Sequence, residues 1–307
     1  MRTAYITHPD CLKHDNGADH PESPERIHAI KDQLIASGIL DFLTHYEAPE
    51  ASKEALARAH TMEYIDKVFS LAPQAGLVHM DDDTAMNPYS LSAALHAAGA
   101  VMRGVDLVMS GEMQNAFCNI RPPGHHAGRG SAAGFCIFNN VAVAAMHALE
   151  HHGLQRVAIA DFDVHHGNGT EDIVHDDPRV MLCSTFRHPY YPYNGIDTGN
   201  EHIINVPLAA GSSGAEFREA VTNKWLPALD RFQPQLILIS AGFDAHWEDD
   251  MGGLALREAD YFWVTEILKG VAKQHADNRI VSALEGGYAL HALGRSVMMH
   301  IKSLSGL

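Results

Sequence analysis

Two carboxylates and a histidine lie close together in one short stretch, Asp161 to Gly169. It reads Asp-Phe-Asp-Val-His-His-Gly-Asn-Gly and follows a mostly apolar run, residues 156–160. If that run is a buried β-strand, Asp161, Asp163 and His165 point to one side, because side chains alternate along an extended chain. Buried carboxylates need a counter-charge, since an unpaired buried charge is costly. The stretch therefore favours a metal site over a purely structural network.

A third carboxylate, Asp244, follows another apolar run, residues 236–240. Together with Asp163 and His165 it offers one nitrogen and two carboxylate oxygens. This donor set leaves a position for water and substrate, as a hydrolytic Zn²⁺ site requires. We expect these three residues to hold one zinc ion per chain.

His125 and His126 lie in a loop rich in proline and glycine, residues 121–128, which is too irregular for a helix or strand. Both cannot join the three metal ligands without crowding. We interpret them as bases that take a proton from water, with Asp161 and Asn168 fixing their tautomers.

Tyr288 follows two glycines, Gly286 and Gly287, which permit close approach of the backbone. Its hydroxyl is a candidate to polarise a substrate carbonyl opposite the metal. Taken alone, a tyrosine at such a place is more typical of packing.

Strands and helices alternate along the chain, and polar residues follow several strands. We expect strands near residues 3–7, 115–120, 156–160, 180–184, 236–240 and 280–284, and helices near 24–38, 52–71, 88–110, 141–152, 169–175, 214–232, 257–275 and 289–304. This alternation predicts one α/β domain over residues 1–307, with a mostly parallel central sheet, helices on both faces and a site at the carboxyl ends of the strands.

Composition excludes some functions. The 307 residues carry a formal net charge of -16, which argues against general nucleic-acid binding and favours cationic substrates. No signal peptide and no run of membrane-spanning length is recognised, so we expect a cytoplasmic protein without membrane association.

The four cysteines show no CxxC pairing and are expected as reduced core thiols. Three of the 22 histidines, His147, His151 and His152, are expected at the surface of one helix.

Five blocks of sequence, in this order, resemble the histone deacetylase family of zinc amidohydrolases, which is related to arginases in fold. The resemblance extends from about His20 to Tyr288, and its blocks are residues 121–126, 134–140, 161–169, 241–244 and 286–288. It implies zinc on Asp163, His165 and Asp244, His126 as general base, His125 as its electrostatic partner, and Tyr288 as carbonyl polariser.

The resemblance also implies a structural potassium ion held by Asp161, Asp163, His165 and Ser184 through side-chain and backbone oxygens. It implies a narrow tunnel for an acyl-lysine chain with walls from Gly134, Phe135 and Tyr191, and Met251 at its mouth. Arg26 matches a residue that guards an inner acetate pocket, although an ordinary ion pair within a helix explains it equally well.

Two departures narrow the match. Asn168 stands where class I enzymes carry an aspartate, which resembles class II and bacterial relatives instead. Gly167 stands where an arginase has a further acid, so a second bridging metal lacks a ligand.

We therefore expect a zinc-dependent deacetylase that removes acetyl or other acyl groups from N6-acyl-lysine in proteins or peptides. An acetylpolyamine amidohydrolase, acting on small acetylated amines, shares every catalytic residue and is the alternative. A binding module for acyl ligands with weak catalysis is a third reading, which Tyr288 disfavours. The sequence assigns no oligomeric state.

Overall fold

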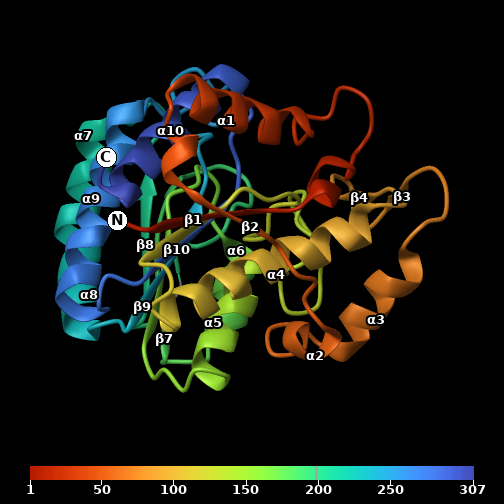
Figure 1. Ribbon diagram of the computed structural model, residues 1–307, viewed down its shortest axis with the longest axis horizontal. Helices are drawn as coiled ribbons and strands as arrows, with labels where there is room; N and C mark the ends of the chain where they lie inside the picture. The colour runs from red at the N-terminus through yellow and green to blue at the C-terminus, as the bar shows by residue number, and fades with distance from the viewer. Residues whose placement is uncertain (198–199) are drawn as a thin grey trace.

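One β-sheet lies between two layers of helices in the computed structural model, which describes residues 1–197 and 200–307 (Figure 1). Within those residues eight strands form the sheet in the order β2-β1-β5-β10-β9-β6-β7-β8, and every neighbouring pair is parallel. The strands are β1 (Thr3–Thr7), β2 (Thr44–Glu47), β5 (Asn115–Cys118), β6 (Val157–Asp161), β7 (Val180–Arg187), β8 (Ile203–Leu208), β9 (Leu236–Ala241) and β10 (Ile280–Leu284); β3 (Val78–His79) and β4 (Ala85–Met86) pair separately.

The helices cover both faces of this sheet, and the predicted α/β fold is confirmed. Side chains of β9 alternate between two apolar cores, because Leu236 and Leu238 pack on one face while Ile237 and Ile239 pack on the other. The first face carries α2 (Lys53–Leu56), α3 (Met62–Leu71), α4 (Ser90–Met109), α5 (Asn140–Glu150) and α6 (Asn168–Val174), and the second carries α1 (Glu25–Ala36), α7 (Gly214–Ala220), α8 (Leu226–Phe232), α9 (Glu258–His275) and α10 (Leu290–Ser305).

One predicted helix, residues 52–71, is two helices. The chain turns between α2 and α3 so that the buried His60 bonds to the Gly128 carbonyl through Nδ1 at 2.9 Å and accepts from the Asn139 amide through Nε2 at 2.9 Å. Thr61 then caps α3 by accepting from the Tyr64 amide. The interruption thus ties this segment to the loop that follows β5.

The edge strands β2 and β8 were not predicted. Strand β2 is short and mostly exposed, so it lacks a clear apolar pattern. Strand β8 contains Pro207, which removes a backbone donor and is tolerated at an edge of the sheet.

Helix α4 corrects the expectation that no segment approaches the length of a membrane span. Its 20 residues are long and apolar enough by length and composition alone. Most of this helix is buried inside the protein, where it packs against α5 and β5, and that packing accounts for its apolar character.

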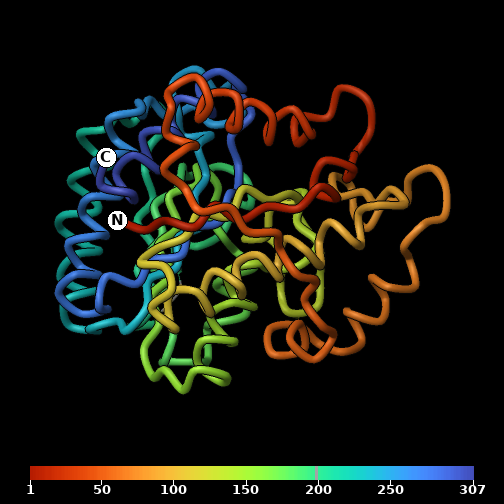
Figure 2. The backbone as a smooth tube through the Cα atoms, in the orientation of Figure 1, coloured from red at the N-terminus to blue at the C-terminus, as the bar shows by residue number. Residues whose placement is uncertain are grey.

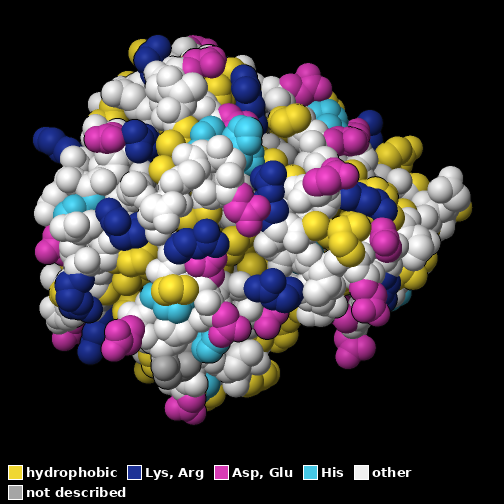
Figure 3. Space-filling view, turned by 90° about the horizontal axis from the view of Figure 1, so that it is seen from below, with side chains coloured by type: hydrophobic (Ala, Val, Ile, Leu, Met, Phe, Trp, Pro, Cys, Tyr) yellow, Lys and Arg dark blue, Asp and Glu magenta, His cyan; other side chains and the backbone are white. Residues whose placement is uncertain are grey.

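The two ends of the chain lie side by side (Figure 2), and the amino group of Met1 donates to the Ser305 carbonyl at 2.6 Å. The four cysteines are buried and free, as predicted. On the face that Figure 3 shows, acidic and basic side chains are interspersed, with histidines among them.

Candidate active site

Adjacent strands deliver the predicted metal ligands to one edge of the sheet. Asp161 ends β6, where it pairs in register with Ser184 of β7 and Ser240 of β9. Asp163 and His165 follow β6, and Asp244 follows β9. Because all these strands are parallel, their carboxyl ends meet, which is where α/β folds build their sites.

Asp163, His165 and Asp244 offer donor atoms within 4.8 Å of one another, and all three side chains are buried. The Nδ1 atom of His165 lies 3.2 Å from Asp163 Oδ1 and 3.2 Å from Asp244 Oδ2. A tetrahedral zinc ion with bonds of about 2.0–2.1 Å holds its ligands about 3.3 Å apart. The three donors therefore fit a zinc ion in both chemistry and spacing.

The surroundings of the two carboxylates support this fit. Burial, with the neighbouring Asp163, raises the pKa of Asp244 to about 7, so a cation is needed to keep both groups ionised. Gly286 leaves room for both carboxylates because it has no side chain. A Cβ at this position would lie 2.2 Å from Asp244 Oδ2 and 2.7 Å from Asp163 Oδ2.

His125 and His126 lie beside these ligands with different partners. His126 Nδ1 donates to Asn168 Oδ1 at 2.7 Å, which leaves Nε2 free to accept a proton. His125 Nδ1 donates to Asp161 Oδ2 at 3.0 Å. The structure thus pairs both histidines with the residues expected to fix their tautomers.

Electrostatics separates the two imidazoles. Burial, together with the nearby His125 and His165, lowers the pKa of His126 well below its usual value. Burial also opposes a charge on His125, but the carboxylates of Asp163 and Asp161 outweigh it and raise the pKa of His125 well above its usual value. The two pKa values are therefore shifted in opposite directions, which favours the neutral form of His126 and the protonated form of His125.

Glu285 supports this loop and was not singled out from the sequence. Its buried carboxylate accepts from the amides of Gly124 at 2.7 Å and His125 at 3.1 Å. Burial raises its pKa to about 7. Its place directly after the predicted strand β10 was the one available signal.

The predicted potassium ligands also converge. Ser184 Oγ is buried and has no hydrogen-bond partner, although it lies in register beside Asp161. An orphaned hydroxyl beside a carboxylate is the kind of oxygen set that a hard cation accepts. These residues fit the ion that the resemblance implied.

All four predicted tunnel residues line one cavity of about 300 Å³ above the metal ligands. The lining comprises Asp83, His126, Gly134, Phe135, His165, Tyr190, Tyr191, Tyr193, Met251 and Tyr288. The Tyr191 ring centroid lies 5.1 Å from that of His126, and the Phe135 ring centroid 6.0 Å from that of Tyr288. Gly134 is required there, because its φ is +54° and a Cβ would lie 2.3 Å from the His126 ring.

Asp83 is the one acid in that lining, and it is the last of three consecutive aspartates. It is half-buried, and its Oδ1 accepts from the Gly134 amide at 3.1 Å and the Thr84 hydroxyl at 3.0 Å. Burial and the neighbouring Asp81 raise its pKa. The structure therefore adds a carboxyl group to the rim.

Tyr288 is fixed on both sides. Its amide donates to Asp249 Oδ2 at 2.6 Å, and the Arg26 guanidinium lies 5.1 Å from its ring centroid. Arg26 also forms an ion pair with Glu22 at 3.1 Å, which confirms the ion-pair reading of this arginine. Burial raises the pKa of Tyr288 well above its usual value, so the hydroxyl stays a donor.

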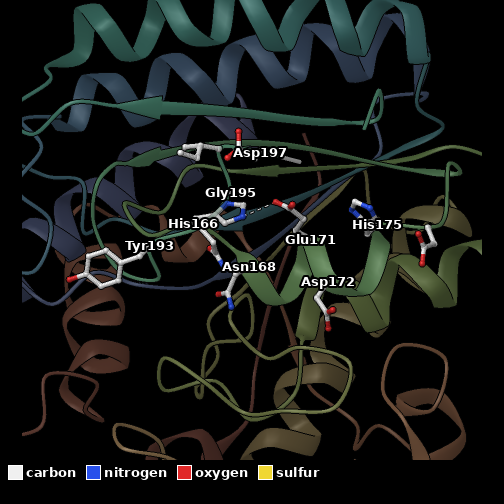
Figure 4. Close-up of a pocket in the computed structure, with 11 residues that line it drawn as sticks. His166, Asn168, Glu171, Asp172, His175, Tyr193, Gly195 and Asp197 are labelled. Carbon is white, nitrogen blue, oxygen red and sulfur yellow. Dashed lines mark ion pairs between the residues drawn. The ribbon is translucent and has the colours of Figure 1, made fainter. Parts of the chain in front are cut away.

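A second cavity of about 630 Å³ lies next to the first, and Tyr193 lines both. In Figure 4, His166 and Glu171 point toward each other at the wall of this cavity and form an ion pair at 2.8 Å. Asp172 and Asp197 also line it, but none of the three metal ligands does. Of the three predicted metal ligands, His165 lines the smaller cavity.

Comparisons with known proteins identify the family of this chain. A profile described as histone deacetylase domain matches residues 20–304. The chain is 35% identical to a histone deacetylase-like amidohydrolase of Pseudomonas aeruginosa, over 100% of this chain and 87% of that protein. It is also 35% identical to the polyamine deacetylase HDAC10 of Homo sapiens, over 100% of this chain but 48% of that longer protein.

Among solved structures, the crystal structure of the HDA15 HD domain superposes with a TM-score of 0.93 at 34% identity, covering 99% of this chain and 88% of that one. A profile match over most of the residues, a relative that is covered over 87% of its length and a shared fold all indicate the same family. The chain belongs to the histone deacetylase family of hydrolases.

Proposed function

We propose that this protein is a zinc-dependent deacetylase that hydrolyses the acyl amide of N6-acyl-lysine in peptides or proteins. The observation that carries the proposal is the meeting of three elements at one cavity. These are the three buried metal donors, of which His165 lines the cavity, His126 with its Nε2 free, and Tyr288.

Asp163, His165 and Asp244 would hold the zinc ion, which as a Lewis acid polarises the amide carbonyl and lowers the pKa of water. His126 Nε2 takes the proton from the attacking water, because its Nδ1 is committed to Asn168 and its low pKa keeps it neutral. The Tyr288 hydroxyl donates to the carbonyl oxygen as negative charge develops there. His126 then returns the proton to the leaving amine.

The narrow aromatic cavity favours a slender acyl-lysine side chain. Phe135, Tyr190, Tyr191 and Tyr288 surround it, and Met251 adds an uncharged, flexible thioether at the rim. Such a rim accepts varied peptide side chains without demanding a second charge on the substrate.

An acetylpolyamine is the second candidate substrate, and Asp83 is the observation that favours it. This carboxyl group lines the cavity, where it can pair with an ammonium group of the substrate. Two other acids are already paired: Glu22 is fully buried against Arg121, and Glu248 pairs with Arg295 at 2.6 Å. The similarity to a polyamine deacetylase supports the same alternative.

Turnover of acetyl-lysine peptides, N-acetylputrescine and N8-acetylspermidine by the zinc-loaded protein, measured side by side, tests the proposal. We expect a higher kcat/KM for the peptides. A strong preference for the acetylpolyamines would overturn the lysine assignment and favour Asp83 as their anchor, and no hydrolysis of either class would overturn the deacetylase assignment.

A further inference from the structure

Three histidines and an aspartate meet at the end of α5, away from the catalytic cavity. His147 lies in the last turn of α5, His151 and His152 follow it, and Asp106 comes from the neighbouring helix α4. We call these four residues the α4–α5 cluster. The expectation that all three histidines lie at the surface was wrong for His147, whose side chain is only 8% exposed, because α4 covers it.

The ligand atoms of the α4–α5 cluster all lie within 4.8 Å of one another. Asp106 Oδ1 is 2.7 Å from His147 Nε2 and 2.8 Å from His152 Nε2. The His151 ring stacks on that of His147, with centroids 4.8 Å apart and planes 11° apart. One carboxylate oxygen therefore already gathers two imidazoles, and a third lies against them.

Arg58 orients the most buried of these imidazoles. It lies 3.0 Å from His147 Nδ1, and since a guanidinium only donates, Nδ1 is the acceptor and Nε2 faces Asp106. Nε2 therefore carries the ring proton in this arrangement and donates to Asp106. Binding of an ion through Nε2 requires the proton on Nδ1 instead, with Arg58 turned away toward Glu150, with which it already pairs at 3.4 Å.

Three imidazoles and one carboxylate form a donor set suited to a borderline dication such as Zn²⁺, Ni²⁺ or Cu²⁺, and not to Mg²⁺ or Ca²⁺, which prefer oxygen. We propose that the α4–α5 cluster is a second metal site, which binds a transition-metal dication and links α4 to α5. His151 is exposed and His152 half-buried, so their rings can turn toward an ion, while His147 must lose its hydrogen bond from Arg58 and carry its proton on Nδ1.

This site is distinct from the catalytic centre. Helix α5 begins beside the catalytic loop, where Asn139 Nδ2 donates to the Ala127 carbonyl at 3.0 Å, and the cluster lies at its other end. Its 11 residues span about 16 Å at 1.5 Å per residue. Figure 1 shows α4 and α5 together on their face of the sheet. The ion would thus stabilise this helical layer without taking part in hydrolysis.

The test uses the full chain without a histidine tag, with its catalytic site loaded, titrated with Zn²⁺ alone by isothermal calorimetry. Wild type is compared with the double variant His151→Ala/His152→Ala, which removes two accessible side chains and spares the buried His147. His28→Ala is the matched control, because His28 is an exposed histidine on helix α1.

We expect wild type and His28→Ala to bind one Zn²⁺ that the double variant loses or binds more weakly by about tenfold or more, since even groups that only orient a ligand are worth about 10–100-fold. Added Zn²⁺ should also raise the Tm of wild type more than that of the double variant, because an ion bound only by the folded state stabilises it. Deacetylation should be unchanged. Equal Zn²⁺ binding by wild type and the double variant would overturn the proposal, as would the absence of any extra ion in wild type.

Discussion

Removing the hydroxyl of Tyr288 separates its chemical role from its packing. In Tyr288→Phe the ring keeps its contacts with Arg26 and Phe135, and the backbone amide keeps its bond to Asp249. The change therefore removes one donor and little else. We expect the Tm and the zinc content to match those of wild type.

The size of the effect follows from the environment of that hydroxyl. Tyr288 lines a cavity of about 300 Å³ and its pKa is raised well above the usual value by burial, so its hydroxyl is a protonated donor at the cavity wall. Losing one such donor to a developing oxyanion typically costs about 2.7–4 kcal/mol, or about 100- to 1000-fold in kcat. We expect a loss of that size with little change in inhibitor binding.

Steady-state deacetylation of an acetyl-lysine peptide measures this effect, with Tyr193→Phe as the matched control. Tyr193 lines the same cavity, but its side chain is 73% exposed at the mouth, so loss of its hydroxyl should leave kcat near the wild-type value. If Tyr288→Phe also retained wild-type turnover, Tyr288 would be a packing residue and the carbonyl would be polarised by other groups.

Three further predictions concern the base, the rim and the buried ion network. His126→Ala should retain zinc by elemental analysis yet be nearly inactive, because the water loses its base; substantial turnover would reassign that role. Met251→Glu should shift the kcat/KM ratio toward acetylpolyamines by about tenfold or more, since a charge-assisted hydrogen bond is worth about 1.5–3 kcal/mol; an unchanged ratio would refute the rim argument. Burial opposes ionisation of Glu22, but Arg121, His14 and Arg26 hold its pKa well below the usual value. Its stabilisation is thus full above the unfolded pKa of about 4.3 and is lost as the pH falls toward the folded value. Glu22→Gln should cost about 3–5 kcal/mol at pH 7, and this difference from wild type should shrink below about pH 4 in urea unfolding; a constant difference would contradict the assignment.

The sequence was most informative where a polar residue follows a buried strand. Asp163 and Asp244 come after β6 and β9, and the parallel arrangement alone requires these strand ends to meet. The same reasoning brought His125 and Tyr288 to that edge, from the loops after β5 and β10. Alternation of strands and helices was enough to predict the layered fold.

Residues whose role depends on packing between distant segments were harder to predict from the sequence. Asp83 belongs to a run of three acids, which is typical of a solvent-exposed loop. Only the fold brings it against Gly134. His147 is buried because α4 crosses it, and no periodicity within α5 indicates that. Strand β2 is too short and too exposed to carry an apolar pattern.

Zinc content of an Asp244→Ala variant tests the central claim most directly. Elemental analysis should be made in the His151→Ala/His152→Ala background, so that the α4–α5 cluster does not contribute. With Asp244 present we predict one zinc ion per chain, and with Asp244→Ala we predict none, because Asp163 and His165 are left as only two ligands. A stoichiometric zinc ion in the Asp244→Ala protein would contradict the assignment of the metal centre.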